Sequence, residues 1–180
     1  MVTIRPELEA DRAAIFEVNQ EVFPTDAEAR LVDTLRAKVA PTTSLVAEVD
    51  GAIVGHIFFS PVTIDGVGGE DVMLGLAPMA VREKFQRQGI GRQLVEAGLA
   101  ACQRASVELV FVLGHPDYYP RFGFQPVAAL GLHYTDPKLD VCFFVKELLP
   151  GALHGARGTV SYHPAFDEAF KGAHGTEPSS

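Results

Sequence analysis

Hydrophobic and polar residues recur along the first part of the chain with the periods of a strand and then of a helix. A short strand is predicted at residues 2–5. Over residues 11–23, Ile15, Val18 and Val22 recur at helical spacing and would share one buried face. Pro24 and Thr25 follow this helix and end it.

A second helix is predicted to start at Thr25 and to run to about Lys38. Thr25 and Glu28 have the spacing of a capping box, in which the two side chains bond each other's backbone amides. Leu31, Leu35 and Val39 would then face the core.

Two Asp-Gly pairs divide the next apolar runs into strands. Asp50-Gly51 joins residues 44–49 to residues 52–59, which is a strong β-hairpin signal. Asp65-Gly66, with Gly68 and Gly69 close by, separates residues 61–64 from residues 72–81. The pattern predicts an antiparallel meander of about three strands.

A helix and a buried strand are predicted next. The helix follows Gly89, ends near Arg104 and carries one apolar stripe, made of Leu94, Val95, Gly98, Leu99 and Cys102. Residues 107–113 form an apolar run broken only by Glu108, as in a strand buried on both faces. Because strand, helix and strand follow one another, residues 72–81 and 107–113 should pair in parallel through a right-handed crossover.

Pro78 lies inside the first strand of this pair. Proline has no backbone N–H, so it favours a bulge or a break in pairing, or else an edge strand. We expect the two parallel strands to separate there and to leave backbone groups free to bind a ligand.

The rest of the chain gives weaker signals. A short helical segment is predicted at residues 117–122, a strand at 141–148, a further strand at 158–162, and a flexible tail at 172–180.

Length and charge restrict the class of protein. The 180 residues, 47% of them hydrophobic, fit a single domain at residues 1–171. A net charge of -8 disfavours nucleic acid as a partner, since binding the phosphate backbone requires many Lys and Arg contacts. No apolar run is long enough for a membrane span, and the amino terminus does not read as a signal peptide, so we expect a cytoplasmic protein. The sequence carries no signal for an oligomeric state.

The sequence gives little indication of a metal site or of disulfide bonds. The two cysteines, Cys102 and Cys142, are too few for a disulfide scaffold and are oddly spaced for a metal site. The six histidines include no pair at i and i+4. We expect no bound metal.

The turn at residues 82–92 has the features of a phosphate-binding site. Gly89 and Gly91 allow a tight backbone turn at the start of a helix, where amide N–H groups have no partner within the helix. The turn also holds four cations, opposed in the sequence only by Glu83: Arg82, Lys84, Arg87 and Arg92. A small polyphosphate ligand is indicated.

Comparison with known phosphate-binding motifs narrows the class of ligand that this turn would bind. A P-loop requires Gly-Lys followed by Ser or Thr, but Arg92 and Gln93 follow Gly91. The dinucleotide fingerprint requires a glycine where this chain has Leu94. Gln86-Arg87-Gln88-Gly89-Ile90-Gly91 instead resembles the Q/R-x-x-G-x-G/A signature of the GNAT superfamily of acyl-CoA-dependent N-acetyltransferases.

A second segment strengthens this resemblance. Tyr119-Pro120-Arg121-Phe122-Gly123-Phe124 resembles the Y-x-K/R-x-G-F segment after the fifth strand of that superfamily, and the run HPDYYPRFGF is similar to bacterial predicted acetyltransferases within it. The resemblance covers roughly residues 4–145. It implies a mixed α/β fold, with a mostly antiparallel sheet and a splayed parallel pair of central strands flanked by helices.

The resemblance also implies a cofactor and its site. Acetyl-CoA would be the acyl donor, its pyrophosphate would lie on the amides of the turn and its pantetheine arm would pair with the splayed strand. The residues implied for the turn are Gln86, Arg87, Gln88, Gly89, Ile90, Gly91 and Arg92, and those for the strand are Met79, Ala80 and Val81. Taken singly, Arg82, Lys84 and Arg92 also fit a solvated face, so Arg87 is the firmest of the four cations.

Tyr119 matches the family position whose phenol gives a proton to the departing coenzyme A thiolate. The alternative role is a tyrosine at the edge of the core, bonded to backbone. Its neighbour Tyr118 is assigned to packing. The acceptor would be the primary amine of a small molecule or a protein. A second hypothesis is a non-catalytic acyl-CoA-binding sensor or interaction module on the same fold.

A base that deprotonates the amine is not identified from the sequence. Each of the six candidates has a more ordinary structural role, and a water chain is the alternative: Glu21, His56, Glu70, Asp71, His115 and Asp117. Four further residues of the carboxyl-terminal third lie in loops and strand ends, where substrate specificity often resides, but are interpreted as ordinary surface residues: His133, Tyr134, His154 and His163.

Overall fold

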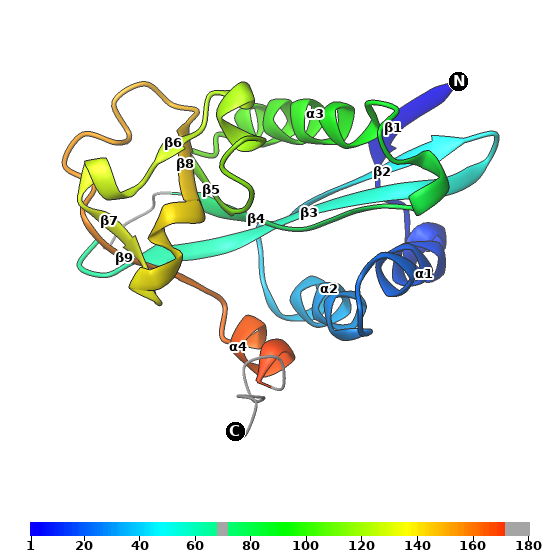
Figure 1. Ribbon diagram of the computed structural model, residues 1–180, viewed down its shortest axis with the longest axis horizontal. Coiled ribbons are helices and arrows are strands. Elements are labelled where there is room, and N and C mark those ends of the chain that lie inside the picture. The colour runs from blue at the N-terminus through cyan, green and yellow to red at the C-terminus, as the bar shows by residue number, and fades with distance from the viewer. Residues whose placement is uncertain (68–71, 172–180) are drawn as a thin grey trace, which may run out of the picture.

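A mixed sheet runs through the part of the chain that the structure, a computed structural model, describes, which is residues 1–67 and 72–171 (Figure 1). Its strands lie in the order β1-β2-β3-β4-β5-β8-β6, and β9 joins the far end of β3 and pairs with β7. The first five strands are β1 (Val2–Pro6), β2 (Thr43–Val49), β3 (Ala52–Ile64), β4 (Met73–Val81) and β5 (Leu109–Leu113). The last four are β6 (Gln125–Pro126), β7 (Leu132–Tyr134), β8 (Phe143–Glu147) and β9 (Gly158–Tyr162).

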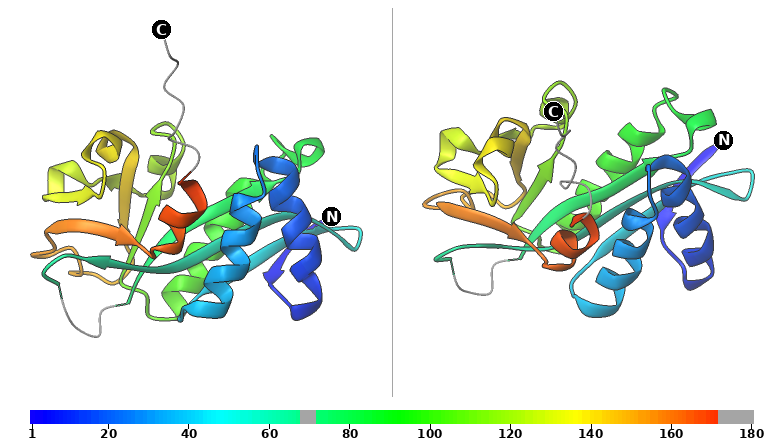
Figure 2. Two further views of the ribbon diagram at one scale, coloured as in Figure 1. Left: turned by 90° about the horizontal axis from the view of Figure 1, so that it is seen from below. Right: turned by 60° about the horizontal axis from the view of Figure 1, so that its bottom comes forward.

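Helices cover both faces of this sheet. α3 (Ile90–Arg104) lies on one face, and α1 (Arg12–Val22), α2 (Ala27–Lys38) and α4 (Ala165–Phe170) lie on the other (Figure 1). Figure 2, which views the second face, shows α2 between α1 and α4. Short 3-10 turns complete the chain: Glu9–Asp11, Glu83–Phe85, Tyr119–Phe122, Ala128–Leu130 and Pro137–Cys142. No helix in residues 1–67 and 72–171 is long and apolar enough to cross a membrane.

The amino-terminal strand and helices follow the hydrophobic pattern, except at the start of α2. Ile15 and Val18 of α1, with Leu31 and Leu35 of α2, are buried against the sheet. The predicted capping box at Thr25 and Glu28 is wrong. Asp26 is the N-cap residue, and Thr25 only accepts the amide of Ala27 at 3.3 Å. The side chain of Glu28 is therefore available for another role.

The predicted meander is confirmed. β2, β3 and β4 are antiparallel, and Asp50 and Gly51 turn the first hairpin with φ angles of 49° and 80°. Both angles lie in the left-handed region, which Asp tolerates and Gly adopts freely. Gly66 turns the second hairpin in the same region, and the predicted Gly68 and Gly69 lie outside the described residues.

The predicted crossover is confirmed as well. α3 connects β4 to β5, and these two strands pair in parallel from Met73 opposite Leu109 to Leu76 opposite Val112. The predicted stripe of α3 is buried against the sheet, where Gly98 leaves room for the ring of Phe59 on β3. The mostly antiparallel sheet with one splayed parallel pair is thus the observed fold.

The carboxyl-terminal third is only partly as predicted. The strands expected at 141–148 and 158–162 are β8 and β9, but β6, β7 and α4 were not predicted. β9 pairs with the last residues of β3, which carries α4 to the face covered by α1 and α2. The tail predicted at residues 172–180 lies outside the described residues.

Candidate active site

The parallel strands β4 and β5 separate beside Pro78. Their pairing stops at Leu76, two residues before the proline. On the other edge of β4, Ile57 of β3 pairs with Met79 and Phe59 pairs with Leu76, so β4 carries one extra residue at the position of Pro78. The missing proline N–H accounts for this bulge. Beyond it, residues 77–81 have no strand partner on the side of β5.

The turn between β4 and α3 presents unpaired amides. Arg87 and Gly89 have φ angles of 59° and 82°, which bend the chain sharply into the helix. The amide of Gln93 makes the first backbone bond of the helix, to the carbonyl of Gly89 at 3.1 Å. The amides before Gln93 thus have no acceptor within the helix. Apart from atoms adjacent in the chain, no atom of the described residues lies within 4 Å of the position that a Gly89 Cβ would occupy, so the turn opens onto free space.

Two glutamine side chains hold this turn in shape. Gln86 donates its side-chain amide to the carbonyl of Val81 at 2.8 Å, and Gln88 donates to the carbonyl of Lys84 at 2.9 Å. The carbonyl of Val81 is therefore occupied, and fewer free backbone groups remain on β4 than the sequence suggested. Ala80 is buried, whereas Met79 and Val81 are half-buried.

The cations of the turn divide into two pairs. Arg82 turns to the opposite side, where it pairs with Glu21 and lies 3.6 Å from Glu17. Arg92 pairs with Glu96 at 2.8 Å. Lys84 and Arg87 are exposed, and the described residues give neither of them an ion pair.

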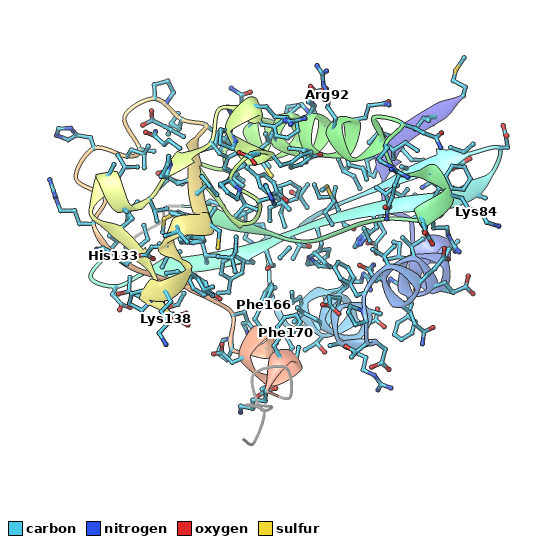
Figure 3. The ribbon with its side chains drawn as sticks, viewed as in Figure 1. Lys84, Arg92, His133, Lys138, Phe166 and Phe170 are labelled. Atoms are coloured by element: carbon cyan, nitrogen blue, oxygen red, sulfur yellow. The ribbon has the colours of Figure 1, made fainter. Side chains whose placement is uncertain are left out.

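The local charge balance is therefore less positive than predicted. Glu83 is not the only opposing acid, because Glu17, Glu21 and Glu96 come close only in the folded chain. Figure 3 shows Lys84 at the turn and Arg92 on the outer side of α3.

Tyr119 lies in a tight aromatic setting after β5. It begins the turn Tyr119–Phe122, is 7% exposed, and packs edge-on against Tyr118 and Phe124. A Cβ on Gly114 would lie 2.1 Å from the Tyr119 ring, so only glycine fits beside it. Burial, and next the neighbouring Tyr118, raise the pKa of Tyr119 above its usual range. The phenol keeps its proton at neutral pH.

Tyr118 connects the two sequence motifs. It packs against Phe122, and the guanidinium of Arg121 lies 5.1 Å from the centre of its ring, in agreement with the packing role expected of it. Its hydroxyl oxygen would be 3.3 Å from a Cβ on Gly91, and Met79 Cε would be 3.9 Å from the same point. The glycine turn, the broken strand and the tyrosine segment thus meet around Gly91.

A cavity of about 890 Å³ opens beside the strand break. Leu76, Pro78 and Met79 of β4 line it together with Tyr119. Its other walls come from the end of α1 and from α2, β5, β7, β9, α4 and the turn that follows β7. Aromatic residues dominate these walls: Phe23, Tyr119, Tyr134, Tyr162, Phe166 and Phe170. Figure 3 shows Phe166 and Phe170 on the side of α4 that faces the sheet.

Glu28 is the residue of this cavity that the sequence interpretation missed. Its Oε2 atom is buried and has no hydrogen-bond partner among the described residues. Burial raises the pKa of Glu28. The incorrect capping box was the reason for the omission, because it assigned this carboxylate to the backbone of Thr25.

Tyr134 was interpreted as a surface residue, which is wrong. It lines the cavity and is half-buried, and burial raises its pKa. The three histidines grouped with it lie outside the cavity walls. His133 pairs with Asp140 at 2.8 Å, His163 accepts the amide of Ala165 at 3.1 Å, and His154 is exposed.

The candidate bases that lie in the described part of the chain do not line the cavity. His56 is fully buried on β3, and burial lowers its pKa to about 3. Glu21 is paired with Arg82, and His115 and Asp117 are exposed. Glu70 and Asp71 lie outside the described residues.

The cysteines pack as apolar side chains. Cys102 is buried, and burial raises the pKa of its thiol to about 11. Cys142 donates its thiol to the carbonyl of Leu139 at 3.3 Å. Within residues 1–67 and 72–171, no three His, Cys, Asp or Glu side chains gather as metal ligands would.

A broken parallel strand, a glycine turn at a helix start and a buried tyrosine after the next strand together match a known class of enzymes. Residues 40–126 match the family described as acetyltransferase (GNAT) domain. Over 166 residues the chain is 40% identical to the uncharacterized N-acetyltransferase YhbS of Escherichia coli K12. The aligned region covers 91% of this chain and 98% of that relative. The chain therefore belongs to the GNAT acetyltransferase family, and the resemblance inferred from its two motifs is confirmed.

Two solved structures share this fold. The first is YhbS of Escherichia coli in complex with CoA, with a TM-score of 0.85, 37% identity and coverage of 92% of each chain. The second is a GNAT family acetyltransferase of Brucella melitensis in complex with acetyl-CoA, with a TM-score of 0.75 and 35% identity. It covers 93% of this chain and 99% of the other.

Proposed function

We propose that this protein transfers the acetyl group of acetyl-CoA to a primary amine. The observation that carries the proposal is the position of Met79. Its side chain lies beside Gly91 at the phosphate-binding turn, and it also lines the cavity that holds Tyr119. A thioester held along β4 would thus reach from the turn into the cavity.

The turn has suitable groups for the coenzyme A pyrophosphate. Amides before Gln93 point out of the helix start, Gly89 leaves space in front of them, and Lys84 and Arg87 supply charge. The pantetheine arm would pair with the open edge of β4 at Met79, Ala80 and Val81, as an added strand does. Bound CoA and acetyl-CoA in the two related structures support this assignment.

The reaction requires one proton at the sulfur. The nitrogen of the neutral amine attacks the thioester carbonyl carbon, the C–N bond forms, and a backbone amide near Met79 stabilises the oxyanion. As the C–S bond breaks, the sulfur takes the phenolic proton of Tyr119. The nitrogen then releases one proton to water. The Tyr119 phenolate takes a proton from water, which restores the phenol for the next turnover. Its raised pKa keeps Tyr119 protonated before each turnover.

Replacing Tyr119 by Phe tests this function. We expect acceptor-dependent thiol release to fall about 100-fold, the usual scale for loss of a general acid. The rise in melting temperature that acetyl-CoA produces should remain, since a ligand that binds only the folded state stabilises it. An unchanged rate would exclude the role of Tyr119, and absence of transfer from the wild type to any amine would favour the acyl-CoA sensor.

Two matched variants at Gly89 test whether the turn binds the pyrophosphate, with the same melting measurement. Gly89→Asp and Gly89→Asn have nearly equal size, and both residue types tolerate the left-handed φ of 82° at this position. Only Asp adds a negative charge where the pyrophosphate would bind. We expect Asp to abolish the acetyl-CoA shift and Asn to keep most of it. An equal shift in both variants would place the pyrophosphate elsewhere.

A further inference from the structure

The acceptor side of the cavity has an unusual charge distribution. Its walls are largely aromatic and aliphatic, but Glu28 contributes a carboxylate whose Oε2 is buried and unpartnered among the described residues. A buried polar atom that lacks a hydrogen bond costs free energy, and buried charges are normally paired. Oε2 of Glu28 therefore has no partner among the described protein atoms, which leaves room for a ligand in the cavity to supply one.

Other charged residues of the cavity leave Glu28 unpaired. Asp136, Asp167 and Lys171 also line the cavity, but all three are exposed at its rim. Asp136 accepts the amide of Lys138 at 3.0 Å, and no ion pair between Lys171 and Glu28 is found in the described part of the chain. Among the described residues that line the cavity, Glu28 is the only charged one that is not exposed.

The cavity also restricts the size and polarity of its ligand. A volume of about 890 Å³ falls within the range of roughly 300–1,000 Å³ typical of small-molecule sites. Six aromatic side chains form the walls around the carboxylate, and aromatic rings bind flat apolar groups and cations well. An apolar body with a single cationic end matches both features.

We propose that the acceptor is a small primary amine with an aromatic or aliphatic body, whose ammonium group binds the carboxylate of Glu28. This inference rests on the proposed function and specifies its substrate class. Glu28 holds the ammonium form in the same cavity as Tyr119, and the aromatic walls bind the body. The bound ammonium gives one proton to water before its nitrogen attacks the thioester. An amine that carries its own carboxylate is disfavoured, because its second charge would lie against apolar walls or against Glu28.

The first test uses the wild-type protein with CoA and two probes of similar shape. We expect 2-phenylethylamine to raise the melting temperature and the neutral 2-phenylethanol not to raise it, since only the amine can pair with Glu28. Equal shifts from both probes, or none from the amine while acetyl-CoA still stabilises the protein, would overturn the inference and leave the proposed function intact. Absence of the acetyl-CoA shift would instead refute the proposed function.

The second test uses Glu28→Gln, which has nearly the same shape without the charge. We expect the KM for 2-phenylethylamine to rise at least 10-fold, with the KM for acetyl-CoA unchanged. The control is Asp33→Asn, which makes the same charge change on α2 at an exposed residue outside the cavity. An unchanged amine KM in the Gln variant, or acetylation of peptide amines but not of 2-phenylethylamine, would overturn the inference.

Discussion

At the scale of single residues, a buried polar chain explains why His56 does not serve as a base. Asn19 donates to its Nδ1 atom over 3.1 Å, and its Nε2 donates to the hydroxyl of Ser44 over 3.0 Å. Ser44 in turn donates to Glu7, which forms an ion pair with Arg36 at 2.7 Å. Nδ1 of His56 accepts in this chain and Nε2 donates, so the ring carries one hydrogen and is neutral. Burial, and next the charge of Arg36, lower the pKa of His56 to about 3.

The depressed pKa predicts a loss of stability in acid. In the unfolded chain His56 titrates near 6.5, so between pH 6.5 and 3 the unfolded state binds a proton that the native state does not. Stability should then fall by about 1.4 kcal/mol for each pH unit below 6.5. Urea unfolding of the wild type and His56→Gln checks this. From pH 6.5 to 4 the variant should lose roughly 3 kcal/mol less.

The control for this titration is His154→Gln, at an exposed histidine. It should follow the wild-type profile, because an exposed side chain is surrounded by solvent in both the folded and the unfolded chain. Parallel profiles for the wild type and His56→Gln would show that His56 does not account for the loss.

At the scale of elements, the contact between α3 and β3 positions the phosphate-binding turn. Gly98 of α3 faces Phe59 of β3, and a Cβ on Gly98 would lie 2.6 Å from the ring. Phe59 is fully buried and has no room to move away. The glycine therefore allows the helix to lie close to the sheet, with its first turn beside the broken end of β4.

Gly98→Ala should destabilise the protein despite the better helix propensity of alanine. Propensity would contribute about 1 kcal/mol in favour of the variant, whereas overpacking costs roughly 1–3 kcal/mol and more when the neighbour cannot move. We expect a net loss of up to about 2 kcal/mol in urea unfolding. Adding Phe59→Leu should recover part of that loss, because the two side chains are in contact. Strictly additive effects would contradict this packing.

At the scale of the whole molecule, the carboxyl-terminal segment closes the side of the cavity that we propose for the acceptor. The ring of Tyr162 on β9 packs over Gly75 of β4, where a Cβ on the glycine would lie 2.3 Å from the ring. The hydroxyl of Tyr162 donates to the carbonyl of Phe111 on β5 at 3.3 Å. Phe166 of α4 packs against Tyr162, with ring centres 4.8 Å apart. Tyr162 and Phe166 thus join the paired part of β4 and β5 to the last helix.

Phe166→Ala should loosen this wall without affecting the phosphate-binding turn. Removing a phenylalanine that is 9% exposed should cost roughly 3 kcal/mol. The melting temperature should therefore fall, while the rise produced by acetyl-CoA stays the same, since α4 lines the cavity and not the turn. Phe170→Ala, at a half-buried residue of the same helix, should cost less. A folded Phe166→Ala protein that no longer responds to acetyl-CoA would contradict this separation.

Much of the fold and part of the candidate site were predictable because they depend on residues close together in the sequence. Hydrophobic periodicity predicted β1 to β5 and α1 to α3, and the turn chemistry of Asp50-Gly51 predicted its hairpin. Pro78 predicted the strand break, since a missing N–H acts at its own position. Gln86 to Gly91 and Tyr119 to Phe124 predicted the family through short motifs.

Tertiary structure decided the features that depend on distant partners. Arg82 and Arg92 pair with Glu21 and Glu96, and the half-buried Glu28 lines a cavity instead of bonding the start of its helix. The aromatic wall of Tyr134, Tyr162 and Phe166 exists only because β9 pairs with β3 and carries α4 across the sheet. Short-range periodicity carries no information about such contacts. The sequence by itself therefore determined the family and the acyl-donor motif, and the packing of distant segments determined the shape and charge of the acceptor cavity.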